Sequence, residues 1–424
     1  MTHASAHGAV DAVWRIESPR LIAALTRMVS DVGLAEELAQ DALVIALETW
    51  PTAGVPEKPG AWLMSTAKHR AIDAVRRRQR LQQKQELLGR DLEMEQQQLG
   101  VPELEAVLDE TPIPDDLLRL VFIACHPVLS MDARVALTLR LLGGLTTDEI
   151  AHAFLVPEST IAQRIVRAKR TLTEAHVPFE LPEAPALAER LAAVLEVIYL
   201  IFNEGYSASA GDDWTRPALC EDALRLGRVL AELMPAESEV HGLVALMEIQ
   251  ASRLGARISP SGEPVLLLDQ NRALWNQLLI RRGLAALARA EQTGASLGPY
   301  ALQASIAGCH ARARTADETN WQQIAALYDA LAQLTPSPVI ELNRAMALAM
   351  ASGPEAGLEV VDSLLDEPSL RSYYLLPNVR GDLLVRLGRL AEARVEFERA
   401  ASLAQNQRQK QMLLDRASAV AVKP

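Results

Sequence analysis

The chain has 424 residues, about three times the length of a typical domain, so we expect two to four separately packed units. Hydrophobic residues make up 49% of it and aromatic residues only 4%, which suits packed helices better than sheets and predicts an all-α fold. The net charge of −12 argues against a protein that coats nucleic acid non-specifically, so any DNA contact must be confined to local basic surfaces.

Nothing in the sequence indicates a metal, a cofactor or a membrane segment. Cys125, Cys220 and Cys309 lie far apart without a CxxC pair, and the eight histidines show no metal-ligand spacing. The N-terminus lacks a basic segment followed by an apolar run, and no stretch of about 18 uncharged apolar residues occurs. We therefore expect a soluble cytoplasmic protein without metal or cofactor.

The first predicted domain covers residues 1–81. Apolar residues at helical spacing run from Val10 to Leu81 and are interrupted between Pro51 and Pro59, which predicts helices joined by an exposed loop. Residues 82–112 are rich in Gln, Glu and Asp and are too poor in hydrophobic residues to offset the entropy cost of ordering. We interpret this segment as an acidic linker.

The segment PGAWLMSTAKHRAIDAVRRRQR, residues 59–80, is predicted to be one helix. Small apolar residues from Leu63 to Ala74 form a stripe that suits close packing on another helix. Basic residues at its C-terminal end complement the helix dipole in any case, so a solvated helix end is one alternative. Their place in an acidic chain, and the flat ring of Trp62, favour a DNA contact. The candidate residues are Trp62, Lys68, His69, Arg70, Arg76, Arg77 and Arg80.

A second helical unit is predicted over residues 113–176, and LTTDEIAHAFLVPESTIAQRIVRAKRTL within it has the pattern of a helix-turn-helix. Thr146 and Glu149 form a capping box that begins a short helix through Phe154. Pro157 then breaks the chain, and Glu158 or Ser159 is expected to cap a second helix.

The second helix of this pair is the candidate for entering the major groove. Its apolar face is predicted to consist of Ile161, Ile165, Ala168 and Leu172. Arg and Gln on the other face suit bidentate hydrogen bonds to base edges. Two ordinary antiparallel helices are the alternative, and the turn lacks the glycine often found there. The candidate residues are Ser159, Thr160, Gln163, Arg164, Arg167 and Arg170.

The remaining residues are predicted to form a helical extension over 177–300 and tetratricopeptide-like repeats over 301–424. Aligning Ile324, Gly357 and Ala393 gives spacings near 34 residues, the period of these repeats. The alternative is a set of generic helical hairpins. Two groups are candidates to line a site, although caps and inter-helix hydrogen bonds would also explain them: Asn203, Glu204 and Tyr206, and Asp269, Arg272 and Trp275.

These segments resemble the extracytoplasmic-function sigma factors of the sigma-70 family. DVGLAEELAQDALVIALETW with the 59–80 segment looks like sigma region 2, and the predicted helix-turn-helix looks like sigma region 4. VIYLIFNEGY and DQNRALWN, further along, resemble the subgroup that has a large C-terminal extension related to tetratricopeptide proteins.

The resemblance implies a sigma factor that directs core RNA polymerase to promoter DNA and initiates transcription. Helix 59–80 would recognise the −10 element, helix 159–170 the −35 element, and the acidic linker would follow the RNA exit path. The polymerase would be contacted through its β′ clamp helices and β flap, with the extension as a regulatory module or a site for a protein partner. The residues implied for the clamp contact are Glu36, Glu37, Gln40 and Asp41.

Two other classes of function were weighed against this interpretation. A regulator that binds its operator through the helix-turn-helix, without polymerase, is the main alternative. An enzyme is disfavoured, because Cys125 and His126 are adjacent and would point about 100° apart on a helix. The common phosphate-loop, dinucleotide and zinc-protease motifs do not occur, so we predict no catalysis.

Overall fold

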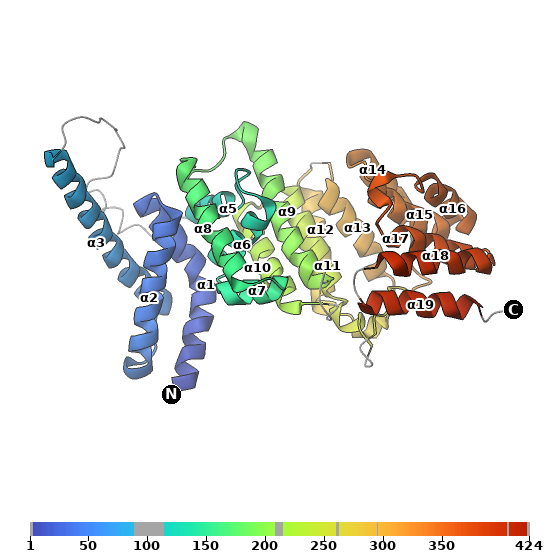
Figure 1. The fold of residues 1–424 in the computed structure, drawn as a ribbon, viewed down its shortest axis with the longest axis horizontal. Helices are drawn as coiled ribbons and strands as arrows, with labels where there is room; N and C mark the ends of the chain where they lie inside the picture. Colours follow the sequence, from blue (N-terminus) through green and yellow to red (C-terminus); the bar gives the residue numbers. More distant parts are fainter. Residues whose placement is uncertain are drawn as a thin grey trace. The chain divides into compact units, whose positions relative to one another are not determined.

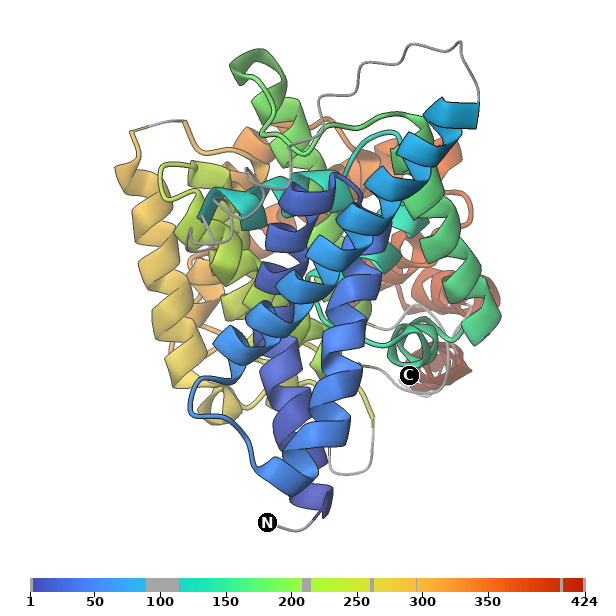
Figure 2. The ribbon, with the colours of Figure 1, turned by 90° about the vertical axis from the view of Figure 1, so that its left-hand side faces the viewer.

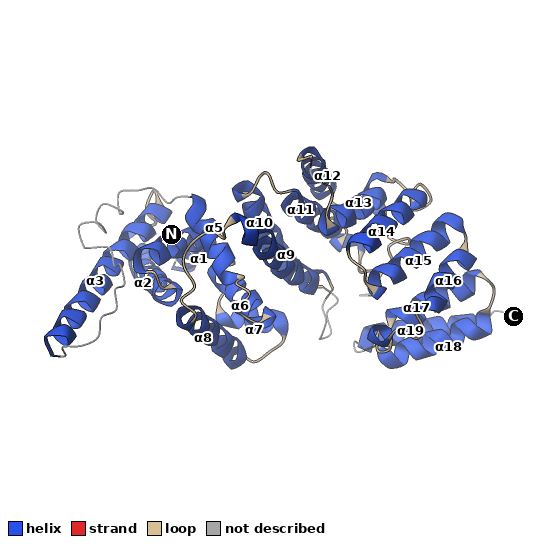
Figure 3. Cartoon of the chain, turned by 90° about the horizontal axis from the view of Figure 1, so that it is seen from above, coloured by secondary structure: helices blue, strands red, loops and turns tan. Residues whose placement is uncertain are grey.

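The computed structural model describes residues 3–88, 114–207, 215–259, 263–294, 296–404 and 407–421. Within these ranges the secondary structure is helical, apart from one isolated bridge between Ile258 and Pro264 (Figure 3). The predicted all-α fold is confirmed. Contacts divide the chain into two units, Met1–Leu200 and Ile201–Pro424, which are described separately.

The first unit begins with three helices that pack against one another: α1 (His3–Val29), α2 (Val32–Ala53) and α3 (Pro59–Leu88) (Figures 1 and 2). The Asp31 carboxylate caps α2 by accepting a hydrogen bond from the Leu34 amide at 2.9 Å. Helix α2 continues through Pro51, so the predicted loop is shorter, at residues 54–58.

Helix α3 is longer than predicted. It extends to Leu88 and thus includes residues 82–88, which the sequence assigned to the acidic linker. The rest of that predicted linker, residues 89–112, lies outside the described residues. Along α3, Leu63, Ala67 and Ala71 are buried as expected, whereas Ala74 is half-buried.

The second half of this unit contains the predicted helix-turn-helix, after α5 (Pro114–Ala124) and α6 (Met131–Leu141). The capping box is present at the start of α7 (Thr147–Phe154): the Glu149 amide donates to Thr146 Oγ1 at 3.1 Å, and the Thr146 amide donates to Glu149 Oε2 at 2.8 Å. Both hydrogen bonds satisfy amides that have no partner within the helix.

The second helix of the pair, α8 (Glu158–Glu174), begins differently from the prediction. Pro157 occupies the N-cap position and no side chain caps the helix, so neither Glu158 nor Ser159 has that role. In the preceding turn, Leu155 adopts a left-handed conformation with φ of 51°. Because the turn lacks a glycine, an exposed leucine takes the backbone geometry that glycine would adopt more easily.

The boundary between the units falls within helix α9 (Ala184–Tyr206), and the second unit continues as a series of helices. Three short 3-10 helices, η1 (Leu254–Ala256), η2 (Arg272–Leu274) and η3 (Pro368–Leu370), interrupt the series. The remaining helices are α10 (Pro217–Leu233), α11 (Ser238–Ala251), α12 (Gln277–Gln292), α13 (Pro299–Arg312), α14 (Trp321–Leu334), α15 (Pro338–Ser352), α16 (Pro354–Ser363), α17 (Leu375–Arg386), α18 (Leu390–Leu403) and α19 (Gln407–Ala421).

The three residues that the sequence aligned as equivalent positions of successive repeats occupy equivalent positions in their helices. Ile324, Gly357 and Ala393 are each the fourth residue of a helix, in α14, α16 and α18 respectively. In the last repeat α17 crosses close to α18, since a Cβ atom on Gly381 would lie 2.6 Å from the Phe397 ring. Small residues at the crossing points therefore let these helices approach closely, which is the packing that the tetratricopeptide pattern requires.

Candidate nucleic-acid interface

Helix α8 exposes a polar and basic face opposite its apolar one. Ile161, Ile165, Ala168 and Leu172 are all buried, which confirms the predicted apolar face. On the other side Ser159, Gln163, Arg167 and Arg170 are exposed, and Thr160 and Arg164 are half-buried.

Two of the arginines on this face already form ion pairs within the chain. Arg164 lies 2.8 Å from a carboxylate oxygen of Asp132, and Arg170 lies 3.4 Å from one of Glu174 on the same helix. Asp132, Arg170 and Glu174 are exposed and the Arg164 side chain is 34% exposed, so these ion pairs contribute little to stability.

Helix α3 carries the second basic surface. His69, Arg70, Arg76, Arg77 and Arg80 are exposed, and Lys68 is half-buried. The half-buried Trp62 packs edge-on against Trp50, with ring centroids 5.5 Å apart. Because Trp50 is only 2% exposed, it anchors the Trp62 ring to the core of the unit.

The acidic residues of α2 lie in different environments. Glu37 and Asp41 are exposed and Gln40 is half-buried, and Asp41 forms an ion pair with Arg70 of α3 at 2.6 Å. The predicted polymerase-contacting residue Asp41 and the predicted DNA-contacting residue Arg70 therefore bind each other in this structure.

Glu36, by contrast, is enclosed by other parts of the unit and is only 2% exposed. Its Oε1 atom accepts hydrogen bonds from Arg140 Nε of α6 at 2.6 Å and from Gln40 at 2.5 Å, and its Oε2 atom pairs with Lys169 of α8. This carboxylate links the first three helices to the helix-turn-helix half. In this arrangement it does not face a partner protein.

Further contacts join the same two halves of the unit. Arg15 of α1 pairs with Glu149 of α7, and Arg27 lies 3.1 Å from the buried Asp116 of α5. Burial raises the pKa of Asp116 above its ordinary value, while Arg27 and Arg119 act in the opposite direction. Gly144 lies against α1, since a Cβ atom there would be 3.3 Å from Arg15 Cα. Because these partners are distant in sequence, no local pattern indicated them.

Cys125 does not have the properties of a nucleophile. Its thiol is buried beside the Thr138 hydroxyl, 3.4 Å away, and burial raises its pKa to about 11. The thiol therefore stays protonated at neutral pH. Burial and the nearby Arg190 and Arg134 lower the pKa of His126 to about 4, so that side chain is neutral there.

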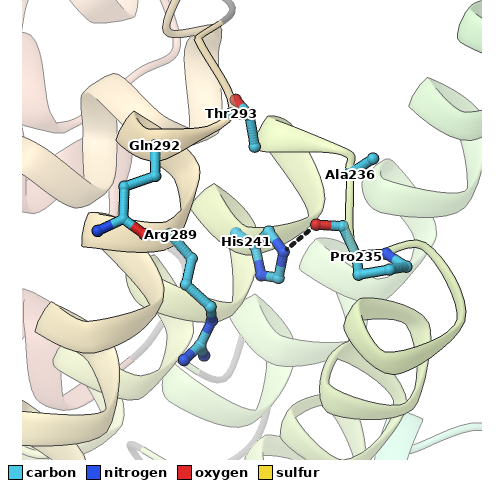
Figure 4. Close-up of a pocket in the computed structure, with 6 residues that line it drawn as sticks. All are labelled: Pro235, Ala236, His241, Arg289, Gln292 and Thr293. Carbon is cyan, nitrogen blue, oxygen red and sulfur yellow. Dashed lines mark hydrogen bonds between the residues drawn. The ribbon is translucent and has the colours of Figure 1, made fainter.

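The extension contains an open pocket next to the turn between α10 and α11 (Figure 4). The buried His241 ring lies between the Arg289 side chain and the Pro235 carbonyl, and its Nε2 atom lies 2.9 Å from that oxygen. Gln292 and Thr293 complete one wall. No helix in the described part of the chain is long and apolar enough to span a membrane, and no group of three or more metal-ligating side chains occurs there.

Comparison with known protein families identifies three segments. Residues 14–81 match Sigma-70 region 2, residues 119–172 match Sigma-70 region 4, and residues 190–291 match a family of unknown function, DUF6596. The first match includes α3 as far as residue 81, and the second includes α7 and α8 as far as residue 172.

Individual relatives agree with these matches. An uncharacterized protein of Rhizobium meliloti (strain 1021) is 44% identical over 92% of this chain and 90% of its own length. The ECF RNA polymerase sigma factor SigK of Mycobacterium ulcerans (strain Agy99) is 31% identical over 36% of this chain and 78% of its own length. The ECF RNA polymerase sigma factor SigX of Bacillus subtilis (strain 168) is 28% identical over 32% of this chain and 66% of its own length.

The two matched regions define a protein of the sigma-70 class. The chain belongs to the extracytoplasmic-function (ECF) RNA polymerase sigma factors, and it carries a helical C-terminal extension.

Proposed function

We propose that this chain directs core RNA polymerase to promoters, with α8 contacting the −35 element and α3 the −10 element. The observation that carries the proposal is α8, the second helix of the helix-turn-helix, which has the exposed Gln163 and Arg167 and the half-buried Arg164 on one face. An arginine or glutamine on such a face is placed to form paired hydrogen bonds with guanine or adenine in the major groove.

Helix α3 supports a separate contact with the −10 element. Its exposed arginines supply charge for the DNA backbone, and Trp62 offers an aromatic ring near the start of the same helix. Stacking of an unpaired base on an aromatic ring contributes roughly 1–3 kcal/mol, which offsets part of the cost of unstacking it. The exposed Glu37 and Asp41 are the candidates for contacting the β′ clamp helices.

Polymerase would have to separate the two halves of the first unit to spread these surfaces to promoter spacing. Separation breaks the ion pairs of Glu36 with Arg140 and Lys169, and it exposes this carboxylate on α2 beside Glu37. Glu36 would then join the polymerase-contacting surface only in the open form. Two weak DNA contacts held by one enzyme would act as a single bivalent attachment.

The extension is proposed to regulate this opening or to bind a protein partner. Tetratricopeptide-like helix pairs leave concave surfaces that suit peptides and proteins. Deletion of the extension should therefore change initiation under at least one condition. Unchanged promoter activity throughout would refute this part of the proposal.

The main test is transcription in vitro with purified core polymerase on a library of upstream regions. We expect selective initiation by the wild-type chain and its loss at −35-dependent promoters in the double variant Arg164→Ala, Arg167→Ala. Loss of one bidentate base contact costs about 1–3 kcal/mol, so two such losses reduce initiation by at least an order of magnitude.

The matched control is Arg281→Ala with Arg282→Ala, which removes the same charge from exposed positions on α12 of the extension. It should leave promoter choice unchanged. Unaltered promoter choice in the α8 variant would count against α8 as the reading helix. Specific binding to a palindromic site by the chain alone, without polymerase, would favour an operator-binding regulator instead.

A further inference from the structure

Three arginines and two aromatic rings form one cluster in the second unit. Arg257 Cζ lies 3.8 Å from the centroid of the Tyr206 ring, and Arg253 Cζ lies 5.8 Å from it. Arg253 Cζ is also 5.9 Å from the centroid of Trp275, and Arg272 Cζ is 5.0 Å from that ring. We call these five residues the arginine–aromatic cluster. It unites Tyr206 and Trp275, which the sequence singled out in two separate groups.

Among the described residues, Arg272 of the cluster has several partners, including the charge of Glu318, whereas Arg253 and Arg257 have no acidic partner. Arg272 donates to the carbonyl oxygens of His310 and Ala313, each at 2.7 Å, and to the Thr319 hydroxyl at 3.1 Å. Within the described ranges, no carboxylate forms an ion pair with Arg253 or Arg257.

Other arginines of the same unit do have acidic partners. Arg228 lies 2.7 Å from the buried Glu248, and Arg380 contacts both Asp362 and Glu396. Among the described residues, the absence of such a partner at Arg253 and Arg257 is therefore a local feature of the cluster.

Several hydrogen-bond donors in the cluster are buried without an acceptor. These are Arg253 Nε, Arg257 Nε and Trp275 Nε1, and the Trp275 side chain is only 3% exposed. A buried N–H group without an acceptor has lost its hydrogen bond to water without replacing it, which destabilises the folded chain, more so when the group is charged. Because all three are donors, the partner that completes the cluster has to supply acceptors.

The shifts in pKa of side chains in and beside the cluster agree with its lack of a described acidic partner at Arg253 and Arg257. Burial lowers the pKa of Arg253, the Tyr206 side chain acts in the opposite direction, and Arg257 lowers it further. Burial together with Arg253 and Arg272 lowers the pKa of the nearby His310 to about 4. Arg253 and Arg257 are half-buried, and a partly buried charge without a counter-ion destabilises the folded chain, so a bound anion would stabilise it.

We propose that the arginine–aromatic cluster binds the phosphate group of a small molecule, with Arg253, Arg257 and Trp275 as donors. A phosphate monoester carries a charge of about −1.5 to −2, which matches two unbalanced guanidinium groups better than a single carboxylate does. Guanidinium also suits the geometry of phosphate oxygens. The three residues lie within the segment that matches the family of unknown function.

The test is isothermal titration calorimetry of the full chain with inorganic phosphate and with pyrophosphate, compared with acetate at matched ionic strength. We expect saturable binding of one phosphate or pyrophosphate per chain and no comparable binding of acetate. Arg253→Gln and Arg257→Gln should each weaken binding at least tenfold. The control Arg281→Gln, at an exposed position on α12, should bind as the wild type does.

Circular dichroism will show whether each glutamine variant folds. If one does not, two further variants still test the proposal. Arg257→Lys keeps the charge but loses the planar fork, and Trp275→Phe removes one donor while keeping a ring, so each should weaken binding several-fold. Equal heats for phosphate and acetate, or wild-type affinity in folded variants of Arg253 and Arg257, would overturn the proposal. Saturable binding of pyrophosphate but not of phosphate would support a ligand with a diphosphate group.

Discussion

Two half-buried arginines of the first unit and the half-buried Arg253 of the second unit lie beside different kinds of group. In the first unit Arg140 and Arg27 reach the buried carboxylates of Glu36 and Asp116, which lie on other helices. In the second unit Arg253 lies against aromatic rings and has no carboxylate within the described residues. Where the chain itself supplies the counter-ion, a charged side chain in the interior holds helices together. Where the described residues supply no counter-ion, the charged side chain marks a candidate binding site.

The largest expected effect comes from removing the counter-ion in the first unit. Glu36→Ala leaves Arg140 and Lys169 without their shared carboxylate, which should destabilise the packing of the two halves by about 3–5 kcal/mol. Hydrogen exchange of amides in α2, α6 and α8 would measure this loss of protection. The neighbouring control Glu37→Ala, at an exposed position, should change stability by no more than about 0.5 kcal/mol. Equal rates of amide hydrogen exchange in both variants would show that Glu36 does not hold the two halves of the first unit together.

The next effect concerns the positive surroundings of His310 in the second unit. Its pKa of about 4 in the folded chain lies below its ordinary value of 6.5, so stability due to the neutral ring is fully present above pH 6.5 and is lost as the pH falls through about 4. The side chain is only 8% exposed, and this shift corresponds to a loss on the order of 3 kcal/mol.

Urea unfolding measured across that pH range would test this prediction. His310→Gln should flatten the pH dependence, because glutamine does not titrate. A slope identical to that of the wild type would mean that burial and the neighbouring arginines do not lower the pKa of His310 as described.

The smallest expected change in stability concerns an exposed ion pair, which can be compared with the buried pairs of Glu36. Arg15 and Glu149 join the same two halves as Glu36 does, but their side chains are 48% and 40% exposed. Arg15→Ala should therefore cost only about 0.2–1 kcal/mol, measured by hydrogen exchange in α1 and α7. High salt should weaken the wild type to a similar extent, since exposed pairs are screened. If Arg15→Ala lowered the stability as much as Glu36→Ala does, buried and exposed ion pairs would not differ in strength here.

Features that depend on neighbours a few residues apart were predictable from the sequence. The Thr146 capping box and the apolar face of α8 follow from spacings of three and four residues, which bring side chains together on any helix. The N-terminus of α8 was predicted wrongly, because Pro157 occupies the position expected for a polar cap.

Features that depend on tertiary packing were not predictable. Glu36 and Arg140 are separated by 104 residues, and the acidic pattern around Glu36 indicated an exposed surface. Arg253 and Arg257 gave no signal, since an arginine near a helix end usually faces solvent. Arg253 and Arg257 flank η1, and only the packing of η1 against the end of α9 and against the segment around Trp275 places these arginines beside the two rings.

The Glu36 ion pairs also set a threshold for any partner that binds only the separated form. The apparent affinity for such a partner equals the intrinsic affinity multiplied by the fraction of molecules already open. If closure is favoured by about 3 kcal/mol, that fraction is below one per cent and the apparent affinity falls more than a hundredfold. In the proposed function, substitutions at Arg140 would thus change the polymerase concentration needed for half-saturation, without changing the bases that α8 is proposed to contact.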